Sequence, residues 1–200
     1  MLQACRITFL FAPQFHPAVK HVAPVRRELG VTTLMNLIGP LANPASVSRQ
    51  VIGVADPDRA PVAAEALRQL GAVHALVVHG RSGLDEISPH GSTDVWEVRG
   101  ETITQWTIDP AIYRLGVDDV ATLRGGSPPE NAARIEGLVA GGTGDEAGTA
   151  ATLLNAGAAI YVAGLAVSYA EGIGRARHVL ASGAARAVLD KWRKASVSIS

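Results

Sequence analysis

Two acidic side chains stand next to each other in the stretch HGRSGLDEIS, residues 79–88, directly after the apolar run VHALVV. Asp85 and Glu86 offer the hard oxygen ligands that Mg²⁺ takes, and this ion is commonly held by one or two carboxylates together with substrate phosphates. If VHALVV is a buried strand, the acidic pair follows its carboxyl end, where ligands bind in open parallel sheets. The competing interpretation is an acidic surface turn, which the spacing alone favours.

A second set of candidates lies in the basic stretch HPAVKHVAPVRRELG, residues 16–30. Arg26 and Arg27 each have the side chain that grips a carboxylate or phosphate through two parallel hydrogen bonds. The alternative is a solvated helix face, and Pro24 disturbs the helical phase, so the pattern leaves open which arginine points inward. His16 is a further candidate, with capping or packing as its alternative role.

A third stretch, GGTGDEAGT at residues 141–149, has the glycines of a phosphate-binding loop. Successive glycines free backbone N–H groups for an anion. The stretch joins two helical patterns with no preceding strand, whereas phosphate loops usually follow a strand. We therefore interpret it as a helix connector.

The elements that must position these residues begin with a βαβ pattern. The runs QVIGVAD and AVHALVV flank PDRAPVAAEALRQLG, in which Asp56 can cap a helix and Gly71 can end it. The two runs should therefore be parallel strands with a right-handed crossover. Downstream, DVWEVRGETITQWTI predicts two strands joined by a tight turn at Gly100 and Glu101. We interpret MLQACRITFLFAPQF and VTTLMNLIGPL as two further strands.

Helices are expected after residue 126, in SPPENAARIEGLVAG, in residues 147–170 and in GIGRARHVLASGAARAVLDKWRKA. Ser127 and Glu130 have the spacing of a capping box at the start of the first helix. Within the second of these, residues 150–170 are long enough to cross a bilayer. Their alanine and glycine content, the polar Asn155 and the lack of flanking tryptophan predict a buried helix of a soluble domain instead.

Together these elements predict an α/β fold with a mainly parallel sheet flanked by helices. We expect a single domain over residues 1–200, in which residues 1–125 form the sheet and residues 126–194 supply the covering helices. A chain of this length can bury a sizeable core.

Charge and cysteine content restrict the class of partner. The 18 basic and 18 acidic residues give zero formal net charge, so no overall field draws the chain to nucleic acid or to a membrane. We therefore expect a small-molecule ligand. Cys5 is the single cysteine, which excludes an internal disulfide and favours a reducing cytoplasm. The apolar N-terminal run lacks a small-residue cleavage site and is not expected to be a signal peptide.

Four stretches taken together closely resemble anthranilate phosphoribosyltransferases, the enzymes of tryptophan biosynthesis: FLFAPQFHPAVKHVAPVRRELGVTTLMNLIGPLANP, VVHGRSGLDEIS, GGSPPENA and LLNAGAAIYVAG. The resemblance covers nearly the whole chain. It implies the C-terminal domain of a nucleoside phosphorylase/phosphoribosyltransferase-like fold. It also implies transfer of a 5-phosphoribosyl group from phosphoribosyl pyrophosphate to the amine of anthranilate, giving phosphoribosylanthranilate and pyrophosphate.

The resemblance also implies roles for individual residues. Asp85 and Glu86 match the family's magnesium-binding acidic pair, and Arg26 matches the arginine that holds the anthranilate carboxylate. His16 and Gly39 match positions that line the anthranilate site. No catalytic side chain is assigned, because the attacking amine is already nucleophilic and positioning and charge stabilisation should dominate.

The chain resembles roughly the C-terminal three-fifths of these enzymes. The family's N-terminal helical domain and its glycine-rich pyrophosphate loop have no counterpart before Met1. We therefore expect an incomplete domain, truncated at its N-terminus and inactive as an isolated chain. Expected partners are a complementing N-terminal polypeptide and a second copy of the chain, because a missing strand would leave an unpaired sheet edge.

Two other functions stay open. The first is a non-catalytic fragment, or a nucleic-acid- or ligand-binding module of the same fold. Zero net charge and the absence of a basic cluster beyond residues 20–27 argue against nucleic acid as a partner. The second is a pyrimidine nucleoside phosphorylase of related fold, which the HPAVK and GLDEIS stretches match less well.

Overall fold

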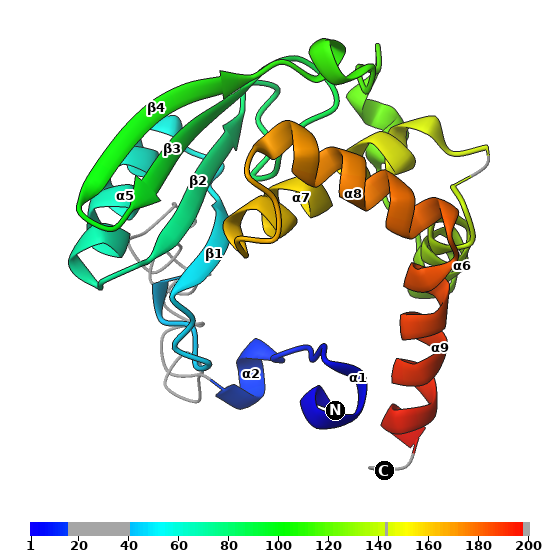
Figure 1. Ribbon diagram of the computed structural model, residues 1–200. Coiled ribbons are helices and arrows are strands. Elements are labelled where there is room, and N and C mark those ends of the chain that lie inside the picture. Colours follow the sequence, from blue (N-terminus) through cyan, green and yellow to red (C-terminus); the bar gives the residue numbers. More distant parts are fainter. Residues whose placement is uncertain (16–40, 143, 198–200) are drawn as a thin grey trace, which may run out of the picture. The chain divides into compact units, whose positions relative to one another are not determined.

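The protein is represented by a computed structural model that describes residues 1–15, 41–142 and 144–197. The chain divides into two compact units (Figure 1). One comprises Met1–Val47 with Lys191–Ser200, and the other comprises Ser48–Asp190. The expected single domain over residues 1–200 stays a prediction.

The first unit begins with two short helices, α1 (Leu2–Cys5) and α2 (Ala12–Phe15). The predicted strand in MLQACRITFLFAPQF is therefore wrong. At the end of α1, Arg6 has a left-handed backbone with φ of 59°, and its N–H donates to the carbonyl of Leu2. A short apolar run without strict alternation does not distinguish a strand from a helix, so local turns decide here. The strand predicted in VTTLMNLIGPL lies outside the described residues, except for its last position.

The second unit is built on a four-stranded sheet in the order β1-β2-β3-β4. The strands are β1 (Arg49–Gly53), β2 (His74–Gly80), β3 (Thr93–Arg99) and β4 (Thr102–Ile108). The strands β1 and β2 are parallel, whereas β3 is antiparallel to both β2 and β4. The predicted βαβ unit and hairpin are confirmed. Among the described strands the sheet is mixed, because the chain reverses direction twice, between β2 and β3 and again at Gly100, where φ is 53°. The expectation of a mainly parallel sheet holds only for β1 and β2.

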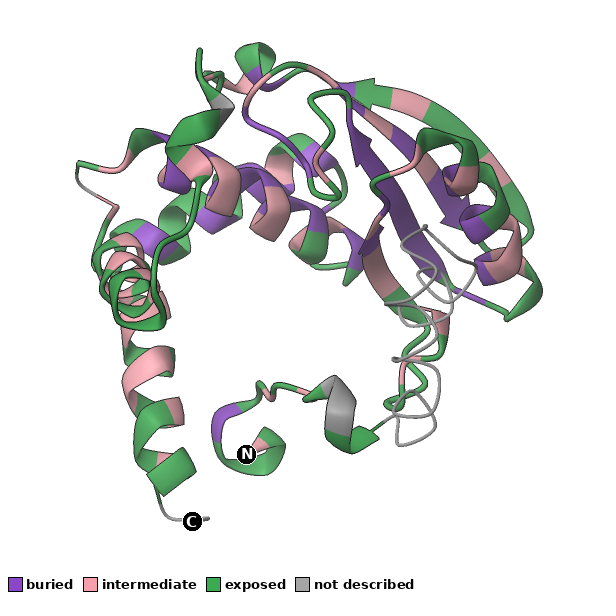
Figure 2. Ribbon diagram, turned by 180° about the vertical axis from the view of Figure 1, so that it is seen from behind, coloured by how far each residue is buried: buried purple, intermediate pink, exposed green. Residues whose placement is uncertain are grey.

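Helices cover both faces of the sheet (Figure 1). On one face lies α5 (Ala60–Gln69), and on the other lie α7 (Glu146–Val162) and α8 (Tyr169–Ala181). Every residue of β2 is buried as a result (Figure 2). The core on the α7 and α8 side is apolar and includes Leu76, Val78, Val95, Ile108, Leu153, Leu154 and Ile173.

Local signals place the helix ends where the pattern predicts them. Asp56 caps the short 3-10 helix η1 (Pro57–Arg59), which leads into α5, by accepting from the N–H of Asp58. Beyond α5, Gly71 is left-handed with φ of 77°. Ser127 and Glu130 form the predicted capping box of α6 (Pro128–Val139).

The C-terminal helices are shorter than the pattern predicts. Residues 147–170 contain most of α7 and the start of α8, separated by a break at which Ser168 caps α8. A second break separates α8 from α9 (Ala184–Val197). Where α7 and α8 cross, a side chain on Gly172 would overlap the carbonyl of Gly157, so glycine permits the close approach. None of the described helices has the length and apolar content needed to cross a membrane.

Candidate functional site

The predicted magnesium ligands lie in the connection between β2 and β3, residues 81–92, which we call the acidic loop. Asp85 and Glu86 are both exposed. Neither carboxylate forms an ion pair or side-chain hydrogen bond with any described residue. As far as the described residues go, the two adjacent carboxylates are therefore available to a cation.

The acidic loop lies against the carboxyl ends of the two parallel strands. A side chain on Gly53, the last residue of β1, would overlap the backbone carbonyl of Asp85. On Gly80, the last residue of β2, a Cβ atom would lie 3.1 Å from the carbonyl oxygen of Glu86. Glycine at both strand ends allows the loop backbone to approach this closely. The acidic pair therefore lies at the edge of the sheet where ligands are expected.

Hydrogen bonds within the loop hold its backbone in place. The N–H of Gly80 donates to Leu84 at 2.9 Å, and the N–H of Arg81 donates to Ser92 at 2.9 Å. After the acidic pair, the fully buried Ser88 donates its hydroxyl to the His90 carbonyl at 2.7 Å. These hydrogen bonds define the path of the loop backbone.

A side chain from α7 also contacts the acidic loop. The Oδ1 atom of Asn155 accepts from the N–H of Ile87 at 3.1 Å, and its Nδ2 atom donates to the carbonyl of Ile87 at 2.9 Å. Sequence reasoning noted Asn155 only as a polar residue in an apolar helix. That polarity was the signal for this contact, because helix α7 otherwise carries few polar side chains.

His79, in β2, forms a hydrogen bond to the backbone just after the end of β1. Its Nδ1 atom lies 2.9 Å from the carbonyl oxygen of Val54, while the N–H of Val54 donates to Val78 at 2.9 Å. Since a carbonyl only accepts, Nδ1 carries the proton in this contact. The imidazole is buried and was not predicted as a site residue.

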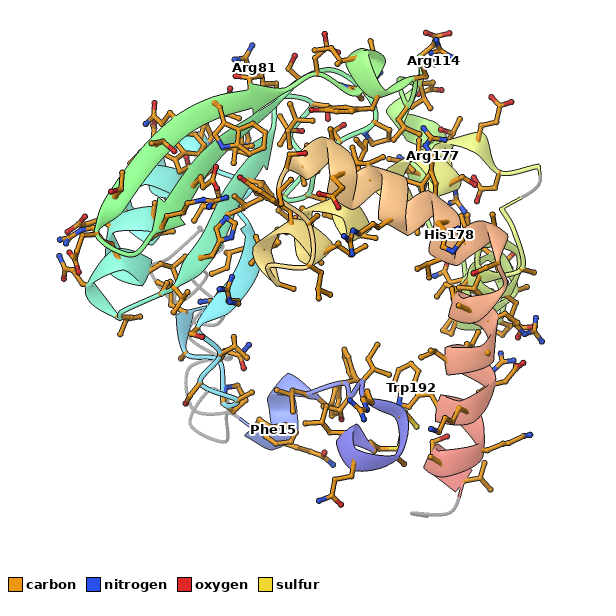
Figure 3. The ribbon with its side chains drawn as sticks, viewed as in Figure 1. Phe15, Arg81, Arg114, Arg177, His178 and Trp192 are labelled. Atoms are coloured by element: carbon orange, nitrogen blue, oxygen red, sulfur yellow. The ribbon has the colours of Figure 1, made fainter. Side chains whose placement is uncertain are left out.

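Two arginines at this edge are paired with carboxylates outside the acidic pair. Arg81, which Figure 3 shows near the end of the β2 ribbon, donates to both oxygens of Asp94, at 3.0 and 2.7 Å. Arg59 forms an ion pair with Asp56 at 2.9 Å. Hydrogen bonds from these arginines lower the pKa of Asp94 and of Asp56. The charge of these arginines is therefore largely compensated by Asp94 and Asp56.

The acidic pair lies in neither of two open cavities found among the described residues. One, of about 610 Å³, lies beside β3 and β4 and is lined by Pro57, Asp58, Pro61, Arg81, Asp94, Val95, Trp96, Gln105, Trp106 and Thr107. The other, of about 570 Å³, lies at the start of α7. Neither cavity is lined by Asp85 or Glu86.

The other predicted site residues have different outcomes. His16, Arg26 and Gly39 lie outside the described residues, so their roles stay predictions. The stretch GGTGDEAGT joins α6 to α7, as predicted, although residue 143 is not described. Within it, Asp145 caps α7 by accepting from Gly148 at 2.8 Å and binds Arg134. Its carboxylate is thus used in holding the connector.

Comparison with known proteins places the chain in a class of enzymes. Residues 1–186 match the family described as "Glycosyl transferase family, a/b domain", and the chain belongs to this family.

The similar proteins within this class are anthranilate phosphoribosyltransferases. The one from Haloarcula marismortui is 50% identical over 186 residues, which cover 92% of this chain and 55% of the relative. The crystal structure from Thermus thermophilus has a TM-score of 0.83 at 44% identity, covering 92% of this chain and 54% of that one. The structure of the Saccharomyces cerevisiae enzyme in complex with PRPP and Mg has a TM-score of 0.86 at 27% identity. This match covers 96% of this chain and 55% of that one.

These similarities confirm the resemblance found in the sequence and the α/β fold class. The chain spans about half the length of the relatives it matches.

Proposed function

We propose that the chain is part of a pentosyltransferase that moves a 5-phosphoribosyl group from phosphoribosyl pyrophosphate to anthranilate, in tryptophan biosynthesis. The products would be N-(5-phosphoribosyl)anthranilate and pyrophosphate. The observation that carries the proposal is the acidic loop. It places two carboxylates, neither paired with a described residue, at the carboxyl edge of a parallel strand pair, in a chain similar to an enzyme solved with PRPP and Mg.

The residues of the acidic loop fit Mg²⁺. Asp85 and Glu86 are the type of donor that this ion takes, and no described residue competes for them. The described part of the chain contains no group of three or more side chains suited to holding a metal. We therefore propose that Asp85 and Glu86 supply the protein ligands and that substrate phosphates supply others. When bound, the ion would neutralise charge that accumulates on the departing pyrophosphate.

The chain's own residues would act mainly by positioning. Arg26 is proposed to hold the anthranilate carboxylate, with His16 and Gly39 lining the same site. The anthranilate nitrogen would form a bond to C1 of the ribose as the bond from C1 to pyrophosphate breaks, and the nitrogen then loses a proton. Because this amine is neutral and nucleophilic, holding the two substrates in line supplies most of the rate enhancement.

We also propose partners for the chain. Since it covers about half of its relatives, residues outside it would complete the donor site, and a complementing N-terminal polypeptide is one source. A second copy of the chain is another candidate partner. We expect the 200-residue chain alone to be inactive. The single cysteine favours the cytoplasm as its compartment.

The decisive experiment follows the loss of anthranilate fluorescence with phosphoribosyl pyrophosphate and Mg²⁺. The chain is assayed alone and mixed with the part of the Haloarcula marismortui relative that it does not cover. We expect turnover only in the mixture, and no turnover when the mixture contains the double variant Asp85→Asn/Glu86→Gln. Turnover by the chain alone would contradict the need for a partner. Full turnover by the double variant would contradict the metal assignment, and a folded but inactive mixture would favour a non-catalytic module of the same fold.

A further inference from the structure

The side-chain amide of Asn155 forms hydrogen bonds that join α7 to the acidic loop. Its Oδ1 atom accepts from the N–H of Ile87 at 3.1 Å, and its Nδ2 atom donates to the carbonyl of the same residue at 2.9 Å. Nδ2 also donates to the carbonyl of Ala151, one turn earlier in α7, at 2.9 Å. Both amide protons are therefore used, so the orientation of the amide group is defined.

The Asn155 amide binds the backbone of Ile87, the residue that directly follows the acidic pair. Ile87 is 1% exposed, and its side chain is part of the core packed against α7 and α8. Its backbone N–H and carbonyl are held by Asn155 in the same pairwise manner as a strand holds its neighbour. Glu86 is therefore joined by a single peptide unit to an anchored backbone position.

The backbone of the acidic pair itself contacts the ends of two strands. The carbonyl of Asp85 lies against Gly53 at the end of β1, and the carbonyl of Glu86 lies near Gly80 at the end of β2. The ends of β1 and β2 thus contact the backbone of the acidic pair itself, while α7 binds the backbone of the next residue, Ile87. Of these three contacts, the one with Asn155 uses a side chain that can be shortened without adding a steric clash.

The amino acid at this position is not explained by helix formation. Helix α7 is rich in alanine and leucine, and asparagine forms helices less readily than alanine does. Ala156 and Ala159, on the same helix, show that alanine is used at positions that are not buried. The side chain therefore has a role in tertiary contact, and its contacts are with the acidic loop and its own helix.

We propose that Asn155 is a positioning residue for the acidic pair: it fixes the backbone beside Glu86 and so sets the geometry in which Asp85 and Glu86 meet a divalent cation. This inference rests on the proposed function for its metal. Groups that orient metal ligands from outside the coordination sphere commonly change metal affinity by roughly 10- to 100-fold when they are removed.

The test compares three proteins as full 200-residue chains: the wild type, Asn155→Ala and Thr149→Val. Thr149 is a matched control, since it also lies in α7 and also loses one side-chain bond to a backbone carbonyl, that of Gly142 at 2.9 Å. Asn155→Asp is added as a second variant because it is isosteric and keeps the acceptor for the Ile87 N–H but loses the donor to the Ile87 and Ala151 carbonyls. Thermal unfolding confirms that each protein is folded.

Two quantities are measured. Amide hydrogen exchange, followed by mass spectrometry on peptides covering residues 83–88, reports the order of the loop. Titration of Mn²⁺ in the presence of pyrophosphate, followed by the electron paramagnetic resonance of free Mn²⁺, reports affinity. We expect Asn155→Ala to speed exchange in the loop and to raise the Kd at least roughly tenfold. Asn155→Asp should also speed exchange, because its second oxygen faces two carbonyl oxygens, whereas Thr149→Val should change neither quantity.

The outcomes separate this inference from the proposed function. Unchanged exchange in the loop of Asn155→Ala would overturn the inference whatever the metal does. Faster exchange with an unchanged Kd would also overturn it, because the loop would then bind without this support. A wild-type chain whose Mn²⁺ affinity is the same as that of Asp85→Asn/Glu86→Gln would instead overturn the proposed metal site, and the exchange measurement would still decide whether Asn155 orders the loop.

Discussion

The last residue of β1, Gly53, lies so close to the backbone of Asp85 that any side chain at position 53 would overlap the Asp85 carbonyl. The two residues are brought together because β1 and β2 are parallel and the acidic loop follows the end of β2. The acidic pair therefore depends on a glycine in a different strand. This relationship can be tested without changing either carboxylate.

Gly53→Ala should displace the acidic loop. Because the added methyl group meets backbone and not a movable side chain, we expect a loss of about 1–3 kcal/mol in the free energy of unfolding. Urea unfolding followed by circular dichroism measures this loss, and Mn²⁺ titration should show weaker binding. The control is Gly174→Ala in α8, where a methyl group meets no atom within 4 Å. That variant should be neutral or slightly stabilising, and an equal loss in both would contradict the role of close approach.

Glu97→Ala should be among the most damaging single changes in the sheet. The Glu97 carboxylate is buried and accepts from Arg99 at 2.7 Å, from Trp106 at 2.8 Å and from Tyr161 at 2.9 Å. Removing it leaves these donors without their acceptor, which should cost about 3 kcal/mol in the free energy of unfolding. Denaturant unfolding at pH 7 measures the loss.

The control for Glu97 is Glu101→Ala, at the tip of the same hairpin. Glu101 pairs with Arg68 on the surface, so its removal should change stability by less than about 1 kcal/mol. A loss at Glu97 no larger than the loss at Glu101 would show that the buried bonds contribute little.

The stability of the protein should fall below neutral pH partly because of His74. Burial lowers the pKa of His74 below its ordinary value of 6.5, and this outweighs the bond from its Nε2 atom to Glu97, which acts in the opposite direction. The cation of Arg99 also lowers the pKa of His74. The unfolded chain therefore binds this proton more readily than the folded one. Stability from His74 is complete above pH 6.5 and declines as the pH falls from 6.5 towards the lower folded-state pKa.

The measurement is urea unfolding of the wild type and of His74→Gln at a series of pH values from about 5 to 8, a range that brackets an ordinary histidine pKa. Glutamine cannot titrate but can still donate to Glu97. We expect the difference in free energy between the two proteins to change with pH below 6.5 and to be constant above it. A difference that is constant over the whole range would show that the His74 pKa is not shifted.

Arg26→Ala should weaken the binding of anthranilate more than the binding of the phosphoribosyl donor. A charged hydrogen bond to the carboxylate would be lost, so we expect the KM for anthranilate to rise by roughly 10- to 100-fold in the complemented enzyme. Arg27→Ala is the control, because it removes the same charge one residue away. Equal losses for the two variants would contradict the assignment of Arg26.

Much of the local structure could be predicted from short-range signals. The cap at Asp56, the turn at Gly100 and the capping box of Ser127 and Glu130 each depend on residues within a few positions of one another. Such signals need no contact with a distant part of the chain, so they can be read from the sequence. They failed at the N-terminus, where an apolar run without alternation forms helices α1 and α2 instead of the predicted strand.

The sequence by itself determined the acidic pair, the βαβ unit and, through its motifs, the family. Only the tertiary structure decided what holds the pair in place: Gly53 is 32 positions before Asp85, and Asn155 is 68 positions after Ile87. Likewise, Glu97 has partners in three elements other than its own strand. Periodicity shows which face of an element is buried but not which residue of another element it meets. That choice depends on how the helices pack on the sheet, and it therefore exists only in the folded chain.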